Sequence, residues 1–254
     1  MIESKITQSK VKNQLKVHSN RYVFLYTLTL TTIVAVVLAF LATSLKPLQD
    51  KNEALFKKKD ILTAVDAEFA DADDSVIEET FAKVQQFVLD AEGNVVKKQN
   101  AAGEEIRAED LDMKKEEKKA EADRQYPLYV YNHKGKDLYV VSARGNGLWD
   151  KIWGSFALED DFRTIAGATF DHTGETPGLG AEIKDNSDWK KKFVGDKIYN
   201  DETGQYLVVK KGGETEANKD YEVDAISGAT VTCDGVTDMI ANGMAPYFAY
   251  FKNK

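Results

Sequence analysis

Residues 22–45 form a mostly apolar run without a single Asp, Glu, Lys or Arg, and Arg21 and Lys46 bracket it. At about 1.5 Å per residue, a helix over this run is long enough to cross a hydrocarbon layer of about 30 Å. Tyr22 and Tyr26 stand where interfacial aromatic residues are expected. The sequence therefore predicts a transmembrane helix over residues 22–45.

A cleaved signal peptide is the alternative interpretation, because residues 42–44 read Ala-Thr-Ser and faintly resemble a cleavage site. The apolar run is longer than the usual hydrophobic segment of about 7–15 residues in a signal peptide, so a retained span is favoured. Basic residues do not decide its orientation, since they are equally numerous on both flanks: Lys5, Lys10, Lys12, Lys16 and Arg21 before it, and Lys46, Lys51, Lys57, Lys58 and Lys59 after it.

Composition limits what the rest of the chain can do. The roughly 200 residues after the span can bury one core. The net charge of −8 argues against a nucleic-acid partner. Cys233 is the only cysteine, which excludes an intrachain disulfide and a Cys-ligated iron–sulfur cluster held by this chain alone. The three histidines are too scattered to indicate a metal site.

Local patterns after the span predict an α+β fold with a mostly antiparallel sheet. Residues 75–78 read as a capping box that opens a helix, with Ile77, Phe81, Val84 and Val88 on one face. Residues 104–124 are dense in charge and read as a solvated helix or flexible insertion. The expected strands and the later helix are two hairpins (126–132 with 137–142, and 155–159 with 164–170), a short helix near 187–194, and strands near 206–211 and 221–226. We divide the chain into residues 1–21, the span 22–45, a juxtamembrane region 46–125 packed on or tethered to the main domain, and a main domain 126–254.

Residues 224–232 read Asp-Ala-Ile-Ser-Gly-Ala-Thr-Val-Thr. The following apolar residues have helical spacing, so a helix is expected to start near Thr232, with Thr232 or Asp234 as its N-cap and with Pro246 kinking or ending it. Free N–H groups at such a helix start attract anions. By composition alone, an ordinary turn between a strand and a helix explains the segment equally well.

Two further glycine-rich segments lie upstream, at residues 145–149 and 174–180. Neither matches the phosphate-binding pattern of nucleotide folds. Glycine allows a backbone to approach a planar ligand closely, and Leu148, Trp149 and Leu179 could cover the face of such a ligand. The alternative interpretation is that these bulky side chains plug the core.

Together, the three segments resemble a known family. Gly-Leu-Trp from Gly147, Glu-Thr-Pro-Gly-Leu-Gly from Glu175 and the segment 224–232 occur in the order found in the C subunit of the sodium-translocating NADH:quinone reductase. The last segment resembles a flavinylation motif, Asp-x-x-Ser/Thr-Gly-Ala-Thr-x-Ser/Thr. The resemblance covers residues 126–254 and the anchor. His172 stands one residue further from Glu175 than in the family spacing.

The resemblance implies a cofactor and its site. FMN would be esterified through its phosphate to Thr230 by a separate flavin transferase. The rest of the motif, which would serve recognition or shape the turn, is Asp224, Ser227, Gly228 and Ala229. The residues that would embrace the flavin are Glu175, Thr176, Gly178, Leu179, Gly180, Gly147, Leu148 and Trp149.

The resemblance also implies a role and a location. The chain would relay electrons between NADH oxidation and quinone reduction in a multi-subunit complex of a bacterial inner membrane, with residues 1–21 cytoplasmic and the flavin domain periplasmic. The sequence shows no paired carboxylates or Ser/His/Asp set, which agrees with an electron carrier. The uncharged span offers no ion pathway, so sodium transport would belong to partner subunits. Two alternatives remain: the equivalent flavin subunit of an Rnf-type ferredoxin:NAD complex, and a membrane-tethered binding module without a cofactor.

Overall fold

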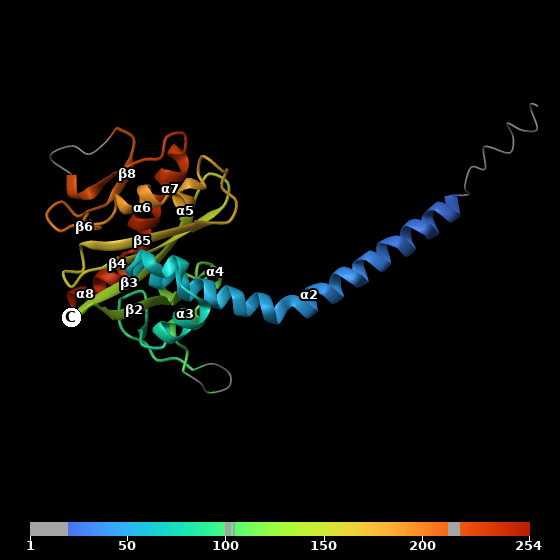
Figure 1. Ribbon diagram of the computed structural model, residues 1–254, viewed down its shortest axis with the longest axis horizontal. Helices are drawn as coiled ribbons and strands as arrows, with labels where there is room; N and C mark the ends of the chain where they lie inside the picture. The colour runs from blue at the N-terminus through green and yellow to red at the C-terminus, as the bar shows by residue number, and fades with distance from the viewer. Residues whose placement is uncertain (1–19, 100–102, 104, 213–218) are drawn as a thin grey trace, which may run out of the picture. The chain divides into compact units, whose positions relative to one another are not determined.

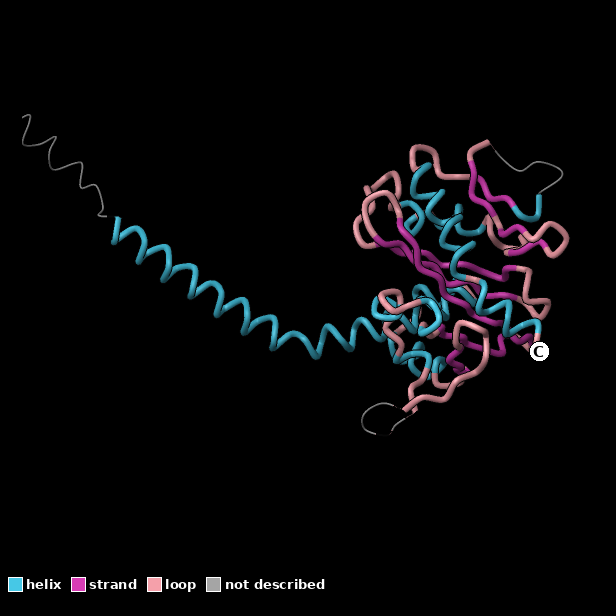
Figure 2. Tube along the Cα trace, turned by 180° about the vertical axis from the view of Figure 1, so that it is seen from behind, coloured by secondary structure: helices cyan, strands magenta, loops and turns pink. Residues whose placement is uncertain are grey.

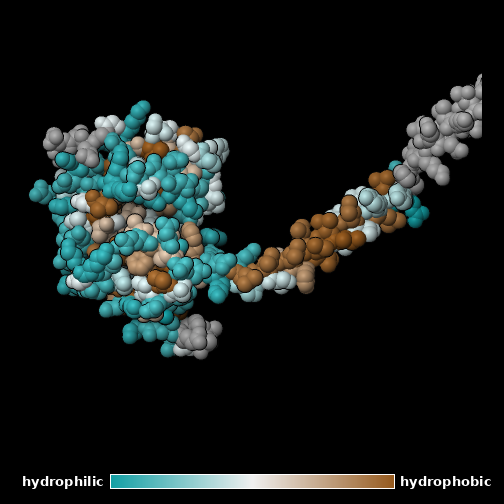
Figure 3. Space-filling model, in the orientation of Figure 1, coloured by the Kyte–Doolittle hydropathy of each residue, from teal (hydrophilic) through white to brown (hydrophobic). Residues whose placement is uncertain are grey.

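The computed structural model describes residues 20–99, 103, 105–212 and 219–254, in two compact units, Met1–Asn52 and Glu53–Lys254. Helix α2 (Asn20–Val65) begins in the first unit and continues past the expected end of the span, with Pro47 inside it. By length and composition α2 can cross a membrane, and its most apolar stretch is wholly exposed. Apolar side chains accordingly gather along its surface (Figure 3).

A five-stranded antiparallel sheet is the centre of the second unit (Figure 1). Its strands lie in chain order: β1 (Gln85–Leu89), β2 (Tyr126–His133), β3 (Lys136–Asn146), β4 (Lys151–Leu158) and β5 (Ile165–His172). The expected α+β class and both expected hairpins are confirmed. Strands β2 and β3 are longer than predicted, β4 starts earlier and ends at Leu158, and β5 starts at Ile165 and ends later. Because β1 pairs with β2, the sheet takes an edge strand from the region before residue 126.

Both faces of the sheet are buried, and β3 shows how the sequence achieves this. Side chains alternate along a strand, so Val141 and Ala143 join one apolar cluster while Leu138 and Val140 join the other. The first cluster lies under α7 (Thr230–Gly243) and α8 (Ala245–Lys252). The second lies under the end of α2 and under α3 (Asp74–Phe81). Helices therefore flank the sheet on both sides, as the trace in Figure 2 shows.

Short elements complete the second unit. They are η1 (Ala67–Asp71), η2 (Ala108–Asp110), α4 (Met113–Glu116), η3 (Glu121–Asp123), α5 (Glu182–Asp185), α6 (Ser187–Lys191), β6 (Tyr199–Asn200), β7 (Gln205–Tyr206), β8 (Val208–Lys210), η4 (Lys219–Tyr221) and β9 (Glu222–Asp224). Strands β8 and β9 pair in parallel. The expected helix near residues 187–194 and the break before Pro246 are confirmed, since α7 ends at Gly243 and α8 has its proline in the first turn.

The predicted capping box at residues 75–78 is wrong. Helix α3 starts one residue earlier, at Asp74, and its N-cap Asp73 makes no side-chain capping bond. The helix also ends at Phe81, so Val84 follows it and Val88 lies on β1. All four predicted apolar residues are nevertheless buried in one cluster, because the chain turns and brings β1 back against the same core.

The charged segment 104–124 was predicted to be a solvated helix or flexible insertion, but part of it packs into the core of the second unit. Its first residue, 104, lies outside the described residues. Ala108 and Leu111 are buried in the second apolar cluster. The Lys57 ammonium donates to the carbonyl oxygens of Glu109 (2.8 Å) and Leu111 (2.9 Å), which fastens the segment to α2. The prediction rested on the density of charged side chains, whereas the contacts that hold the segment are made by a few apolar residues and by backbone carbonyls.

Candidate functional site

Thr230 is the first residue of α7, two positions before the predicted helix start. Its N-cap is Ala229, which provides no side-chain hydrogen bond, so the prediction of Thr232 or Asp234 as N-cap is wrong. Thr230 and Val231 are exposed, whereas Thr232 is only 1 % exposed. The acceptor predicted by the motif is therefore an exposed residue at a helix start that no side chain caps.

The Glu175 carboxylate joins the three glycine-rich segments. Its Oε1 accepts from the backbone N–H of Trp149 (2.9 Å), and its Oε2 accepts from the Thr232 hydroxyl (2.7 Å). Gly147 and Gly180 make this possible, because a Cβ at either position would collide with the carboxylate oxygens. One buried side chain thus fixes the first loop, the second loop and the start of α7 against one another.

The electrostatics of Glu175 follow from these contacts. The residue is 5 % exposed, and burial by itself raises the pKa of a carboxyl group. Burial is the largest single influence, but the hydrogen bonds from the Trp149 backbone, the Thr232 hydroxyl and the backbones of Asp150 and Leu148 together outweigh it, so the pKa of Glu175 is lowered from 4.5. The side chain is therefore ionised at neutral pH and holds its donors by charge-assisted hydrogen bonds.

The bulky apolar side chains of the two loops do not plug the core. Leu148, Trp149 and Leu179 are 52 %, 69 % and 42 % exposed. The Trp149 indole is still oriented, since its Nε1 donates to the Thr176 hydroxyl (3.0 Å). Leu179 also lies against Gly228, which brings the second loop to the predicted flavinylation motif. Side chains of this kind on the surface indicate contact with an apolar ligand or a partner.

Asp224 is the motif residue that stands apart from Glu175. It ends β9, where its carbonyl accepts from the Trp189 indole (2.8 Å) and its carboxylate lies 3.4 Å from the Lys192 ammonium. Ser227 and Gly228 are exposed, and Ala229 is buried beneath them. Gly178 is exposed, with open space where a Cβ would be.

Comparison with known proteins places the chain. A family model described as "FMN-binding domain" matches residues 147–245. The C subunit of the Na(+)-translocating NADH-quinone reductase of Haemophilus ducreyi is 34 % identical over 88 % of this chain and 91 % of its own. The corresponding protein of Neisseria meningitidis serogroup A is 35 % identical over 89 % of this chain and 92 % of its own.

The chain belongs to the family of C subunits of the Na(+)-translocating NADH-quinone reductase. Solved structures of the family agree with this fold. The crystal structure of the family member from Parabacteroides distasonis has a TM-score of 0.70 and 32 % identity, and covers 83 % of this chain and 98 % of its own. NqrC of Shewanella oneidensis has a TM-score of 0.66 and 26 % identity, and covers 80 % and 100 %. These names favour the quinone-reductase family over the Rnf-type alternative.

Three further residues lie near the site. His172, set aside for its spacing, accepts the backbone N–H of Glu175 at Nδ1 (3.1 Å). Thr232 positions Glu175 instead of capping the helix. Cys233 is fully buried and its Sγ accepts the Ile226 N–H, while burial raises the pKa of the thiol, so its role is structural. The family spacing between a histidine and the glutamate could have predicted the His172 contact, but His172 stands one residue further from Glu175 than in the family.

The described residues fit FMN and offer no site for a metal. Among residues 20–99, 103, 105–212 and 219–254, no group of three His, Cys, Asp or Glu could hold an ion. An exposed hydroxyl at the start of a helix suits an esterified phosphate. Exposed apolar side chains on the adjoining loops suit the ring system.

Proposed function

We propose that this chain is the membrane-anchored electron carrier of a sodium-translocating NADH:quinone reductase, with FMN attached to Thr230 through a phosphoester. The observation that carries the proposal is that Thr230 is exposed at a helix start without a side-chain cap. Thr230 is two residues after Gly228, which lies against Leu179 of the second loop. The family model supports FMN as the cofactor.

Helix α7 supplies the phosphate environment. It has 14 residues, and its first N–H groups and the positive end of its dipole favour an anion at Thr230. A threonine hydroxyl is a weak nucleophile without an adjacent base. Activation would therefore come from a separate flavin transferase, for which the small, exposed residues Ser227 and Gly228 leave access.

The remaining site residues would position the flavin. FMN supplies one- and two-electron chemistry when bound. Leu148, Trp149 and Leu179 would shield it from water on one side, and Glu175 would hold their loops in place. None of these residues needs to transfer a proton, which is consistent with a carrier whose task is position and potential.

The anchor and location form part of the same proposal. Residues 22–45 of α2 would span a bacterial inner membrane once, with the N-terminus cytoplasmic and the flavin domain periplasmic. Membership of a family named for a multi-subunit reductase supports the membrane setting and the partner subunits. Since the span carries no charged residue, those partners would provide the sodium pathway.

The test is coexpression of the full chain with a flavin transferase, followed by intact mass and in-gel fluorescence. We expect an added mass of FMN minus water and fluorescence that survives denaturation. Thr230→Ala should lose both, whereas Thr203→Ala, a change at another exposed threonine, should keep both. Flavin labelling of the Thr230→Ala variant would refute the assignment of Thr230 as the acceptor. An unlabelled wild type, alongside a labelled known acceptor, would leave the cofactor-free tethered module.

The orientation has its own test. Protease added outside spheroplasts should degrade the domain after residue 52 and leave the first unit protected. Digestion only after lysis would reverse the proposed topology without affecting the flavin assignment.

A further inference from the structure

His172, the last residue of β5, holds the backbone of Glu175 at the point where the second loop leaves the sheet. The Nδ1 of His172 lies 3.1 Å from the Glu175 backbone nitrogen and accepts its N–H. The exposed residues Thr173 and Gly174 are all that separates the two in the chain. Glu175 is only 5 % exposed, and buried N–H groups are rarely left without an acceptor. The imidazole nitrogen therefore fixes the start of this loop.

The hydrogen bond requires one chemical state of the His172 ring. A ring nitrogen accepts a hydrogen bond only when it carries no proton, so the proton of the neutral ring is on Nε2. An imidazolium carries protons on both nitrogens and can only donate. Protonation of His172 and its bond to Glu175 therefore exclude one another.

The carboxylate of Glu175 offers no replacement contact for a protonated ring. It already accepts the Trp149 N–H (2.9 Å) and the Thr232 hydroxyl (2.7 Å), which tie the second loop to the first loop and to α7. Glu175 is thus held twice, by its side chain toward these partners and by its backbone toward His172. Loss of the backbone bond would loosen the loop where it leaves β5.

Other charged groups at this end of β5 lie on the opposite face of the strand. Asp171 precedes His172, so its side chain points to that face, where it lies 2.9 Å from the Lys184 ammonium. The Asp171 carboxylate also accepts the His172 backbone N–H (2.8 Å). Asp60 and Lys190 interact electrostatically with Asp171. These charges balance one another within their own cluster.

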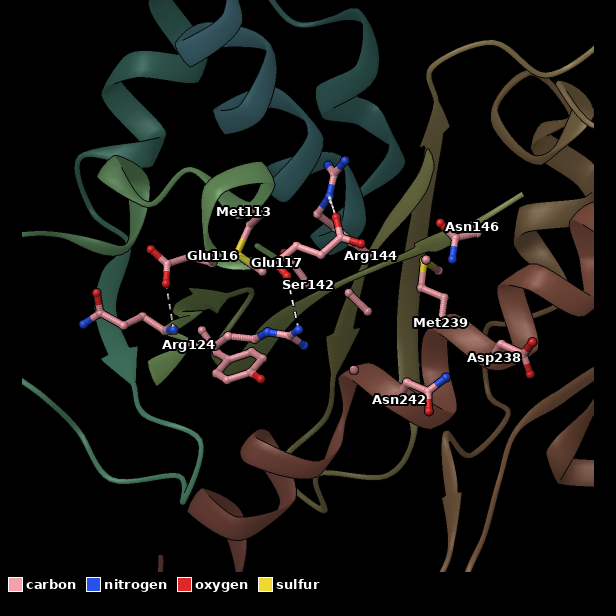
Figure 4. A pocket seen from close by; sticks show the side chains of 15 residues that line it. Met113, Glu116, Glu117, Arg124, Ser142, Arg144, Asn146, Asp238, Met239 and Asn242 are labelled. Atoms are coloured by element: carbon pink, nitrogen blue, oxygen red, sulfur yellow. Dashed lines mark hydrogen bonds and ion pairs between the residues drawn. The ribbon is translucent and has the colours of Figure 1, made fainter. Parts of the chain in front are cut away.

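The neighbouring strand β4 and the first loop carry further charges that are also engaged. Lys151, the first residue of β4, pairs with Glu117, which lines a cavity of about 390 Å³ (Figure 4). The Asp150 carboxylate accepts the Lys151 backbone N–H (2.7 Å). The contact with Glu175 is therefore the one that changes when the His172 ring gains a proton.

We propose that His172 is a positioning residue for the second loop: its neutral ring holds Glu175, and its protonation releases the loop. Histidine is the side chain that changes charge between pH 5 and 8, so the loop should loosen as pH falls through this range. The loop carries Leu179, which would cover the flavin, so release would expose the ring system. That last step rests on the proposed function.

Hydrogen exchange of the Glu175 amide tests the positioning role, measured on the full chain in nonionic detergent and expressed without a flavin transferase. His172→Asn is the informative variant, because its side-chain oxygen can accept in place of Nδ1 and does not titrate. At pH 8, wild type and His172→Asn should protect this amide equally, and His172→Ala about tenfold less. At pH 5, protection in wild type should fall toward that of His172→Ala, while His172→Asn should keep it.

His133→Asn is the matched control. His133 also ends a strand, β2, but its Nε2 faces the Asp66 carboxylate (3.0 Å). Its replacement should leave protection of the Glu175 amide as in wild type at both pH values. In addition, ¹⁵N spectra of wild type at pH 8 should show Nδ1 of His172 without a proton and Nε2 with one.

A second readout follows the flavin. In the flavinylated protein, His172→Ala should raise the acrylamide quenching constant of the flavin fluorescence, and His172→Asn should not. An unchanged constant in His172→Ala would overturn the step from loop release to flavin exposure. The exchange measurement needs no flavin, so an unflavinylated wild type would refute the proposed function while exchange still decides the role of His172.

The positioning role is overturned by any of several results. These are equal protection of the Glu175 amide in wild type and His172→Ala at pH 8, protection in His172→Asn as low as in His172→Ala, wild-type protection that does not fall at pH 5, the same loss in His133→Asn, or a proton on Nδ1 at pH 8.

Discussion

Replacing Glu175 should weaken the contacts that join the two loops and the start of α7, because this one carboxylate accepts from both Trp149 and Thr232. In Glu175→Gln, the amide oxygen can still accept the Trp149 N–H, and the amide nitrogen can donate to the Thr232 hydroxyl. What is lost is the charge of the acceptor. Hydrogen bonds to charged groups contribute about 1.5–3 kcal/mol and neutral ones about 0.5–1.5 kcal/mol, a difference of about 1–1.5 kcal/mol for each bond, so the loss of charge at both bonds should cost about 2–3 kcal/mol.

Glu175→Ala should cost more, because it leaves buried donors with no acceptor. Each such donor costs about 1–3 kcal/mol, so the expected loss is about 3–5 kcal/mol for the Trp149 N–H and the Thr232 hydroxyl together. The exposed Glu202 provides the matched control, and Glu202→Gln should change stability by less than about 0.5 kcal/mol.

The dependence on pH identifies the mechanism. The pKa of Glu175 is lowered in the folded state, so its stabilisation is fully present above the ordinary value of 4.5 and is lost as pH falls through the folded pKa. The difference between wild type and Glu175→Gln should therefore be largest near pH 7 and shrink below pH 4.5. Denaturant titration followed by near-ultraviolet circular dichroism measures it. A difference below about 0.5 kcal/mol at pH 7, or one independent of pH, would refute the reasoning.

Further predictions concern the core. Burial raises the pKa of Asp60 to about 6 from 3.8, so its ionisation opposes folding increasingly from pH 3.8 to pH 6 and fully above. Asp60→Asn should stabilise the protein by on the order of 2 kcal/mol at pH 8 and hardly at pH 4, measured by denaturant titration at both; a larger gain at pH 4 would contradict this. Tyr247→Phe removes a buried hydroxyl that donates to the Ser142 carbonyl (2.9 Å), and should cost about 1–2 kcal/mol in the same assay. Gly167→Ala would bring a Cβ into the Ala64 carbonyl oxygen, which should reduce the free energy of unfolding by about 1–3 kcal/mol and so lower the melting temperature. An unchanged melting temperature would show that α2 can move away.

Much of the fold followed from local patterns. The two hairpins were predictable because alternating apolar residues and turn residues lie next to one another in the chain. The capping box at residues 75–78 failed because Ser75 lies inside α3 and its N-cap is Asp73. The packing of the segment 104–124 was missed because part of it depends on Lys57, which is more than 50 residues away from Leu111. No local sequence pattern predicts that the ammonium of a distant lysine donates to these backbone carbonyls.

The sequence alone determined the apolar helix and the order of the three motif segments, since both depend on neighbouring residues. It also placed Thr230 in the motif. That Thr230 is the acceptor of FMN remains a prediction. Only the tertiary structure brought Glu175 to Trp149, 26 residues away, and to Thr232, 57 residues away. The physical reason is that such contacts depend on which strands pair and which helices cover them, and the energy that decides this is spread over the whole core.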